Sequence, residues 1–563
     1  MVSPERPAPD SADATVILPR VDAAPPPREA GSGGAARNSA IMAAGSLVSR
    51  ITGFLRTAVL AAALGGGLVA NAYNTALAFP GMVYELLLGG IMSSVLVPML
   101  VRARKQDADR GEAYTQRLLT LAVVVLGIAT VLAVICAPLF AYAYASDGTA
   151  ATRSVITALS YLMLPTIFFY GLSGIVGAIL NSRGSFAAPM WTPILNNLVV
   201  IALGVYYMVE LGTEEIAPED VTPAQILVLG GGMLLGITLQ ALALLPALRK
   251  VGFRFRWRTD FRRLRLGQLG RVGAWMFLYV GVNQLALVLM FNLLNRVGDD
   301  EAGTAIYSYA FLLLMMAHGI VAVSVITAVL PRMSSAAADG RAGDVADDLN
   351  RGIRMTTVLL APIAVGYVVL ALPISIALFE RGVFDRVASA NMATVLVVAG
   401  LTLLPMSISQ LFNFTYYSLQ DTRTPALINL PVVSLRLSVQ LAWFAAFAVS
   451  ATAVGMMVGN GLSFVFAALF SGLLIRRRIG RIGLRAILGT SARVLAAAVI
   501  AAAAGFGVLK LLGSGEEMTR NEAWLALITG GVVIFAVYGV AALALGTREI
   551  KDVLALVRRK IGR

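Results

Sequence analysis

Long, continuous apolar runs separated by short polar segments are the dominant pattern along this chain. Because apolar and polar residues do not alternate within a run, the pattern favours membrane-spanning helices over barrel strands. A helix also satisfies its own backbone hydrogen bonds, as hydrocarbon requires. We predict fourteen segments, at about 39–64, 69–101, 117–145, 153–181, 187–209, 224–248, 272–296, 303–331, 353–379, 388–417, 425–448, 451–475, 489–512 and 523–546.

Basic residues gather in the loops that follow even-numbered segments. The loop after the sixth segment holds nine arginines and lysines from Arg249 to Arg271 against one acid, Asp260. The loops after the second and twelfth segments and the last stretch are also basic, whereas the loop after the fifth is acidic. By the positive-inside rule, both termini are predicted to be cytoplasmic.

The two halves of the chain resemble each other. Residues 192–200 (TPILNNLVV) and 424–432 (TPALINLPV) share Thr, Pro, Leu, Asn, Leu and Val in register. Segments 1–6 and 7–12 therefore form two lobes of the same orientation, as in alternating-access transporters with a site between lobes. We predict a disordered cytoplasmic tail (1–37, not a signal peptide), an N-lobe (38–249), a basic cytoplasmic linker (250–271), a C-lobe (272–478), two further helices (479–546) and a basic cytoplasmic tail (547–563).

Composition narrows the class of protein. The chain is 58% hydrophobic and only 13% charged, which is typical of an all-α polytopic membrane protein. Its one cysteine, Cys136, excludes a disulfide framework, and its one histidine, His318, argues against a histidine zinc site. We assign the net charge of +14 to cytoplasmic loops rather than to nucleic-acid binding. No Gly-x-x-x-x-Gly-Lys-Ser/Thr phosphate loop occurs, so no ATP site is visible.

Three charges lie inside the first two apolar runs: Arg50, Arg56 and Glu85. Each costs about 2.5–3.5 kcal/mol in a membrane, so such residues usually face a cavity or a partner. Guanidinium groups match phosphate oxygens, which favours an anion site. Six residues along a helix turn by about 600°, so the two arginines point about 120° apart. The alternatives left open are an ion pair with Glu85 and a proton-coupling role for Glu85.

Other polar residues lie within apolar runs. Arg436 is a second candidate for the cavity, against packing or snorkelling. His318 is expected to hydrogen-bond a neighbour. For the asparagines we expect hydrogen bonds between helices, with cavity lining as the alternative; these are Asn71, Asn74, Asn196, Asn197, Asn283, Asn292 and Asn429. The run from Phe253 to Arg258 mixes aromatic and basic residues and is expected along anionic headgroups.

Four motifs in order resemble the MurJ/MviN lipid II flippases of the multidrug/oligosaccharidyl-lipid/polysaccharide exporter superfamily. They are Ser49-Arg50-x-x-Gly53-Phe54-x-Arg56, residues 180–196 (LNSRGSFAAPMWTPILN), residues 379–384 (FERGVF) and residues 416–425 (YYSLQDTRTP). The resemblance implies two six-helix lobes around a cavity, a lipid-tail groove from the last two segments, and pyrophosphate binding by Arg50 and Arg56. Asn71 stands where the family has an acid, and Tyr84 and Leu312 stand where it has arginines.

The resemblance implies a lipid II flippase of the bacterial plasma membrane, moving undecaprenyl-pyrophosphate-linked precursor to the outer leaflet. We expect a transporter rather than an enzyme, without a cofactor, that draws on membrane potential, a monovalent cation gradient or downstream consumption. Expected partners are the precursor, membrane lipids and cell-wall synthesis or division proteins, and no nucleic acid. A cation-coupled small-molecule exporter and a non-transporting scaffold stay open. The predicted substrate-binding residues are Arg50, Arg56, Glu85, Asn71 and Arg436.

Overall fold

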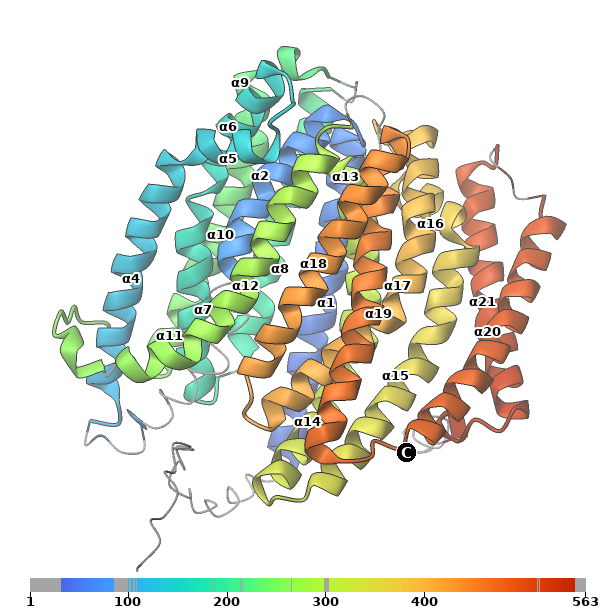
Figure 1. Ribbon diagram of the computed structural model, residues 1–563. Coiled ribbons are helices and arrows are strands. Elements are labelled where there is room, and N and C mark those ends of the chain that lie inside the picture. Colours follow the sequence, from blue (N-terminus) through green and yellow to red (C-terminus); the bar gives the residue numbers. More distant parts are fainter. Residues whose placement is uncertain are drawn as a thin grey trace, which may run out of the picture.

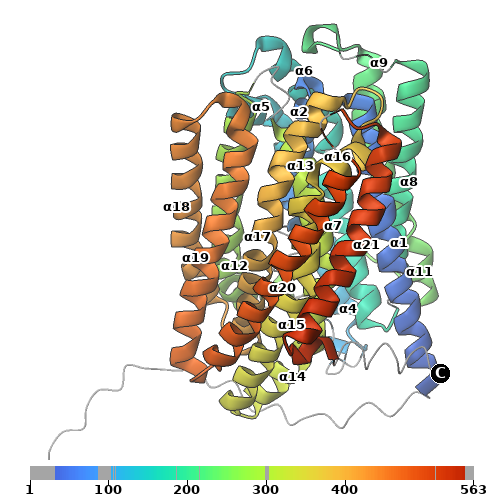
Figure 2. The same ribbon diagram turned by 90° about the vertical axis from the view of Figure 1, so that its right-hand side faces the viewer.

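The protein is a bundle of long helices in the computed structural model (Figures 1 and 2). The structure describes residues 32–85, 100, 103–104, 107, 109–185, 187–212, 214, 216–264, 266–297, 303–513, 515 and 517–551. Over these residues it contains helices and one isolated β-bridge, Arg381–Phe384, and no strand. The all-α fold class predicted from the apolar runs is confirmed.

The first half contains the helices of the N-lobe. They are α1 (Ser32–Leu64), α2 (Leu68–Glu85), α4 (Glu112–Ile135), α5 (Ala137–Tyr144), α6 (Ala150–Met163), α7 (Thr166–Ser182), α8 (Ala187–Glu210), η2 (Pro218–Asp220), α9 (Pro223–Ile226), the π-helical turn η3 (Leu227–Gly231), α10 (Gly232–Leu242) and α11 (Leu245–Lys250).

The second half contains the C-lobe and two more helices. They are η4 (Phe261–Leu264), α12 (Leu266–Leu294), α13 (Thr304–Ala317), the π-helical turn η5 (His318–Ala322), α14 (Val323–Ala338), α15 (Ala342–Val369), α16 (Ala371–Phe379), α17 (Arg386–Ser418), α18 (Arg423–Ala446), η6 (Val449–Ala451), α19 (Thr452–Ile479), α20 (Leu484–Leu511) and α21 (Arg520–Ala544).

Twelve helices in the described part are long and apolar enough to cross a membrane. Each corresponds to one predicted segment. The second segment begins as α2, and residues 86–99 lie outside the described part. The seventh lies on α12, whose apolar stretch, Leu278–Leu294, is shorter than the others. The count of fourteen therefore stays a prediction. The tail predicted over 1–37 lies outside the described residues as far as 31, and α1 begins at Ser32.

Four predicted segments are broken by turns between helices. The breaks fall at Cys136, just before Pro138, at Leu164–Pro165, at Ala243–Leu244, just before Pro246, and at Leu370, three residues before Pro373. Proline lacks a backbone N–H and its ring clashes with the preceding turn, so an apolar run can contain two helices. The predicted linker, 250–271, is shorter than expected because α12 already begins at Leu266.

The same helix neighbours recur in the two lobes. In the N-lobe α8 packs on α1 and α10, α7 packs on α10 and α4, and α6 packs on α2. In the C-lobe α18 packs on α12 and α19, α17 packs on α19 and α15, and α13 also packs on α17. Segment by segment these are equivalent pairs, as the internal repeat of the sequence predicts.

The helices α20 and α21 pack on each other and on the outside of the C-lobe, against α15 and α16 (Figure 2). The hydroxyl of Tyr538 donates a hydrogen bond to the Val358 carbonyl at 2.8 Å. Arg354 pairs with the buried Glu549 at 2.7 Å, just beyond α21. These contacts fix the pair to the lobe.

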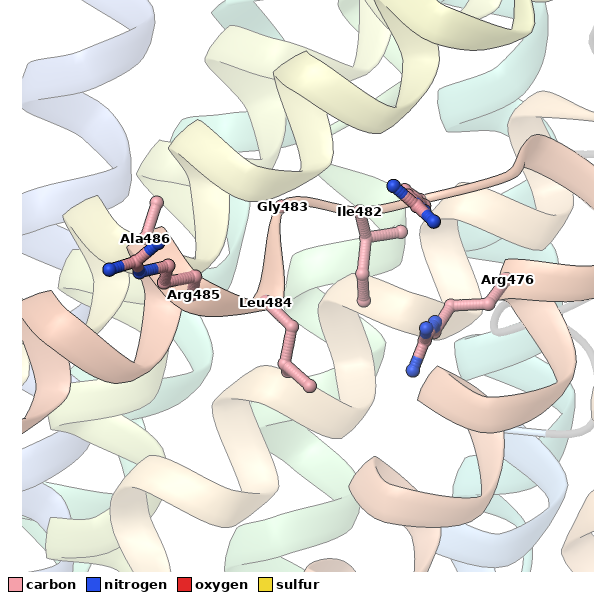
Figure 3. Close-up of a pocket in the computed structure, with 7 residues that line it drawn as sticks. Arg476, Ile482, Gly483, Leu484, Arg485 and Ala486 are labelled. Atoms are coloured by element: carbon pink, nitrogen blue, oxygen red, sulfur yellow. The ribbon is translucent and has the colours of Figure 1, made fainter.

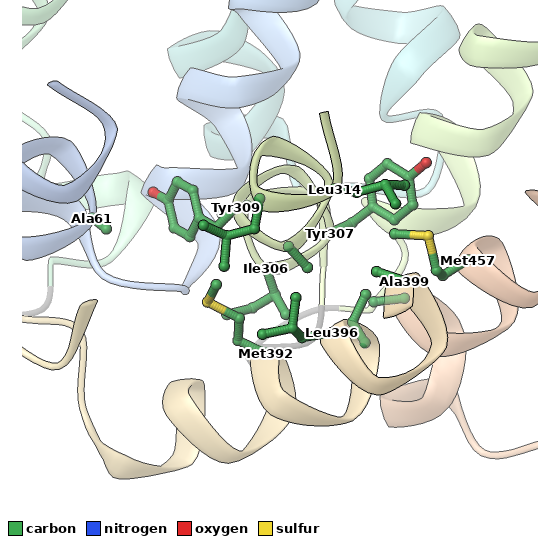
Figure 4. Close-up of a cluster of buried hydrophobic side chains, with 14 of the residues drawn as sticks. Ala61, Ile306, Tyr307, Tyr309, Leu314, Met392, Leu396, Ala399 and Met457 are labelled. Carbon is green, nitrogen blue, oxygen red and sulfur yellow. The ribbon is translucent and has the colours of Figure 1, made fainter. Parts of the chain in front are cut away.

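The largest buried cluster spans both lobes, and α13 runs through its middle. Ile306, Tyr309 and Leu314 of α13 lie between Ala61 of α1 and side chains of α17 and α19 such as Met392 (Figure 4). The N-terminal part of α13 is therefore packed against the opposite lobe, which makes it the element on which the contact between lobes depends.

Candidate functional site

Polar contacts join the two lobes at one end of the molecule, the upper end in Figure 1, and we call this set the seam. Its members in the N-lobe are Ala62, Gly65, Asn71, Thr75, Ala143, Tyr144, Ser146 and Asp147, and in the C-lobe Asn292, Asn295, Arg296, Ala305, Tyr309, Gly382 and Val383. Several of these side chains are deeply buried, so their hydrogen bonds matter for how firmly the lobes meet.

Asn71 of α2 caps a helix of the other lobe. Its side chain is 2% exposed, and its Oδ1 accepts a hydrogen bond from the Ala305 N–H at 2.8 Å. The first N–H groups of a helix have no partner within the helix, and the residue before α13 is Gly303, which has no side chain to cap them. Asn71 therefore acts as the N-cap of α13, although an N-cap side chain usually belongs to the same chain segment as the helix it caps.

Asn295 lies at the centre of the seam with its amide satisfied. Its Nδ2 donates to the Thr75 hydroxyl at 2.9 Å and to the Tyr144 carbonyl at 3.1 Å. Its Oδ1 accepts from the Thr304 hydroxyl at 3.1 Å, and Thr75 is fully buried. A satisfied buried network of this kind favours one arrangement of the two lobes.

At its rim the seam combines the buried Asn292 with an exposed ion pair. The Asn292 Nδ2 donates to the Ala143 carbonyl at 2.9 Å and to the Ser146 hydroxyl at 3.0 Å. Arg296 pairs with Asp147 at 3.0 Å, with 35% and 57% of the side chains exposed. An ion pair as exposed as this one contributes little stability, so the buried amides dominate the seam.

One contact of the seam joins backbone to backbone. The Val383 N–H donates to the Ala62 carbonyl at 3.0 Å. Gly382 has φ +58°, and a Cβ there would overlap the same carbonyl. Gly65, with φ +71°, faces Val383, whose Cγ1 would lie 2.7 Å from an added Cβ. The 379–384 motif singled out in the sequence therefore supplies the close approach of the lobes, and this approach requires glycine.

The two arginines of α1 have different neighbours, as their separation along the helix predicts. The Arg50 guanidinium lies over Gly319 in η5 of the C-lobe, where an added Cβ would be 2.8 Å from Cζ. Arg56 lies close enough to Tyr73 of α2 to interact with it electrostatically. Both arginines are half-buried. Arg50 thus stands between the lobes, and Arg56 faces its own.

The predicted partner of these arginines, Glu85, ends α2, and its side chain lies outside the described part of the structure, as does that of Tyr84. The ion pair and the proton-coupling role both stay predictions. Substrate binding by Asn71 also stays a prediction, and the contact that Asn71 makes is the helix cap. Leu312, where the family has an arginine, is half-buried on α13.

Arg436 lies within the C-lobe. Its Nη2 donates to the Asn283 Oδ1 of α12 at 3.4 Å. Nearby, the Asn460 Nδ2 donates to the Tyr307 hydroxyl at 2.5 Å. The oxygens Asn460 Oδ1 and Gln440 Oε1 are buried without a hydrogen-bond partner in the described structure. Arg436 therefore belongs to a polar cluster between α12, α13, α18 and α19, and its described hydrogen bond stays inside its own lobe.

The expectation of a hydrogen bond for His318 is confirmed, and that of hydrogen bonds between helices is confirmed for Asn197. The His318 Nδ1 lies 2.9 Å from the Ser407 hydroxyl. The Asn197 Nδ2 donates to the Ser49 carbonyl at 3.2 Å and to the Thr52 hydroxyl at 3.0 Å, which joins α8 to α1.

Sequence reasoning missed Thr75, Asn295 and the role of Gly382. One signal for Asn295 is present: it follows Asn292 by three residues, so both amides share a helix face. No such signal exists for Thr75 or Gly382, whose partners lie more than two hundred residues away along the chain.

A protein-family model described as "Lipid II flippase MurJ" matches residues 60–515. The chain belongs to this family. Among curated members it resembles the lipid II flippase MurJ of Burkholderia cenocepacia, with 28% identity over 69% of this chain and 74% of the relative. It also resembles the probable lipid II flippase MurJ of Rhizobium meliloti, with 26% identity over 92% of this chain and 94% of the relative.

Solved structures agree on the fold of this MurJ family member. A lipid II flippase MurJ in an inward closed conformation superposes with a TM-score of 0.72 at 18% identity, covering 91% of this chain and 99% of that one. An inward-facing multidrug resistance MATE transporter of the MOP superfamily gives a TM-score of 0.60 at 14% identity, covering 76% and 95%. Both solved structures therefore share the all-helical fold of this chain.

Proposed function

We propose that this chain is a lipid II flippase that carries the undecaprenyl-pyrophosphate-linked precursor from the cytoplasmic to the outer leaflet. The observation that carries the proposal is the family match, which runs from the last turn of α1 through the rest of both lobes and all of α20. Two lobes of the same orientation with a contact zone between them are the architecture of alternating access.

Arg50 is the side chain best placed to bind the pyrophosphate. It is half-buried, it extends from α1 to η5 of the other lobe, and no described carboxylate pairs with it. A guanidinium binds phosphate oxygens in a bidentate manner and stays charged when partly desolvated. A ligand held there contacts both lobes, so movement of one lobe against the other changes its surroundings. Arg56, about 1.7 turns along α1 from Arg50, would hold the second side of the anion.

The orientation follows from charge. The arginine-rich loops lie at the lower end in Figure 1, opposite the seam. The positive-inside rule then puts both termini in the cytoplasm and the seam on the outer side. In this conformation the seam would close the outer path and would have to part for release. Membrane potential or a monovalent cation would drive the cycle.

The small-molecule exporter of the same superfamily is the second candidate, because MATE transporters share the fold. The helices α20 and α21 argue against it, because they lie outside the two repeated lobes and cover the outside of the C-lobe. A pair of helices facing lipid suits a substrate with a long hydrocarbon tail.

Depletion of the protein in its own host, followed by assay of lipid II on the outer face, tests the proposal. We expect exposure to fall and to return with the parent chain. A normal amount of lipid II on the outer face after depletion, in a strain without a second flippase, would refute the proposal.

The double variant Arg50→Ala/Arg56→Ala tests the site, with Arg254→Ala/Arg256→Ala as a control of equal charge change in an exposed cytoplasmic loop. We expect the first to abolish complementation and the second to retain it. Full growth with the first variant, at normal protein levels, would refute the role of these arginines.

A further inference from the structure

A pocket of about 580 Å³ lies where α19 turns into α20, at the lower end of the molecule in Figure 1, and Figure 3 shows it in close-up. Three arginines line it: Arg476 in the last turn of α19, Arg481 in the connecting loop and Arg485 in the first turn of α20. Ile482, Leu484 and Ala486 form its apolar surface. This volume is within the usual range for small-ligand pockets.

The charge in this pocket is not balanced by the described protein. None of the three arginines forms an ion pair or hydrogen bond with a described residue, whereas the neighbouring Arg478 is paired with Asp421. The beginning of α20 has no side-chain cap, because the residue before it is Gly483. A helix N-terminus carries partial positive charge, so Arg485 is placed where a cation is unfavourable. A bound anion would neutralise the unpaired arginines and would also interact favourably with the positive end of α20.

The loop is held in a fixed shape. The Asn350 Nδ2 of α15 donates to the carbonyls of Ile482 at 2.8 Å and Gly483 at 3.1 Å. Gly483 has φ +66°, and an added Cβ would lie 2.7 Å from that nitrogen. Ile482 is 4% exposed, so the loop is anchored to the C-lobe. The backbone that carries Arg481 and Arg485 therefore needs little ordering when a ligand binds.

The apolar surroundings indicate what kind of anion binds. Leu473, one turn before Arg476, is 61% exposed, and Leu488, one turn after Leu484, is 60% exposed. Because α19 ends and α20 begins at this loop, both leucines lie deeper along the helices than the arginines. Charge at the end and hydrocarbon further in match the order of headgroup and acyl chain in one leaflet.

We propose that this pocket binds an anionic glycerophospholipid of the cytoplasmic leaflet, with its phosphate on Arg476, Arg481 and Arg485 and its acyl chains along Leu473 and Leu488. The lipid bridges α19 and α20 and so fastens the outer helix pair to the C-lobe. The proposal is independent of the transport step, since the pocket lies away from the seam and from α1.

Native mass spectrometry of the purified full chain, titrated with phosphatidylglycerol or phosphatidylcholine, tests it. We expect phosphatidylglycerol to bind more tightly. Each Arg→Gln change at 476, 481 or 485 is expected to weaken it about fivefold, and the triple change about a hundredfold, from ~1 kcal/mol per basic residue at an anionic surface. The triple Arg→Lys variant keeps the charge and is expected to retain most of the binding.

Arg477→Gln is the matched control, because Arg477 is exposed in the same turn but does not line the pocket. Its affinity is expected to stay within twofold of the parent. Equal binding of the two lipids, or equal losses for the control and the single variants, would overturn the proposal. Displacement of the lipid by millimolar inorganic phosphate or by a polyprenyl pyrophosphate at equal concentration would overturn its choice of ligand. If the triple variant does not fold, the lipid affinities of the single variants, compared with those of the parent and of Arg477→Gln, still test the proposal.

Discussion

Replacing Asn71 with alanine should loosen the seam without touching the rest of either lobe. The change removes the acceptor for the buried Ala305 N–H. Loss of an N-cap costs about 0.5–2 kcal/mol, and an unpaired buried donor about 1–3 kcal/mol. Taking about 2 kcal/mol, the equilibrium between joined and parted lobes shifts roughly 30-fold toward the parted state.

The single native cysteine makes the measurement simple. With Cys136 changed to alanine, a cysteine at Ile306 reports on the seam, because that side chain is fully buried and packs against Gly66 of the N-lobe. When the lobes part and rejoin faster than the label reacts, its labelling rate follows the population of the parted state. We expect a water-soluble maleimide to react about 30-fold faster in the Asn71→Ala protein.

Two control variants test whether a faster labelling rate comes from the loss of the helix cap. Asn197→Ala removes an asparagine of similar burial whose hydrogen bonds stay within the N-lobe, so its labelling rate should remain near that of the parent. Asn71→Asp keeps an acceptor and puts negative charge at the positive end of α13, so it should label more slowly than Asn71→Ala. A rate for Asn71→Ala within twofold of the parent, or equal to that of Asn197→Ala, would refute the capping role.

Two further changes test other contacts. Gly382→Ala should also speed labelling and reduce complementation, since it adds a left-handed backbone penalty of about 1–2 kcal/mol and an overlap with the Ala62 carbonyl. Gly340 has φ +71° and open space around it, so Gly340→Ala adds only the backbone penalty. Equal effects of the two variants would contradict the overlap at Gly382. Glu549→Gln should lower the thermal unfolding midpoint, because it leaves Arg354 unpaired, a loss of about 2–4 kcal/mol. Asp344→Asn in the exposed pair with Arg341 should leave the midpoint nearly unchanged. Similar shifts for the two variants would show that burial does not matter here.

The sequence was sufficient for the parts of the fold that depend on local composition. Continuous apolar runs predict helices because each must satisfy its backbone within hydrocarbon, and the repeat at 192–200 and 424–432 predicts the equivalent packing of α8 and α18. The breaks at Cys136 and Leu370 were not predicted, because hydrophobicity does not change where one helix ends and the next begins.

The candidate site was predicted only as a set of residues. A polar side chain in an apolar helix indicates that a polar partner is needed, but the sequence does not show which residue that partner is. Asn71 finds its partner 234 positions away, and Arg436 binds Asn283 within its own lobe. Such contacts depend on how two lobes meet, and this arrangement is set by the packing of the whole chain.

The seam uses main-chain atoms on much of its surface: the carbonyls of Ala62, Gly65, Ala143 and Tyr144 and the N–H groups of Ala305 and Val383. A carbonyl or N–H is present whatever side chain the residue carries. Positions such as Ala143 can therefore drift during evolution while the hydrogen bond persists, and the selective constraint falls on the few residues that reach across. In a saturation mutagenesis screen, we expect narrow tolerance at Asn71, Asn295, Gly65 and Gly382, and broad tolerance at the half-buried Ala143, which contributes only its backbone.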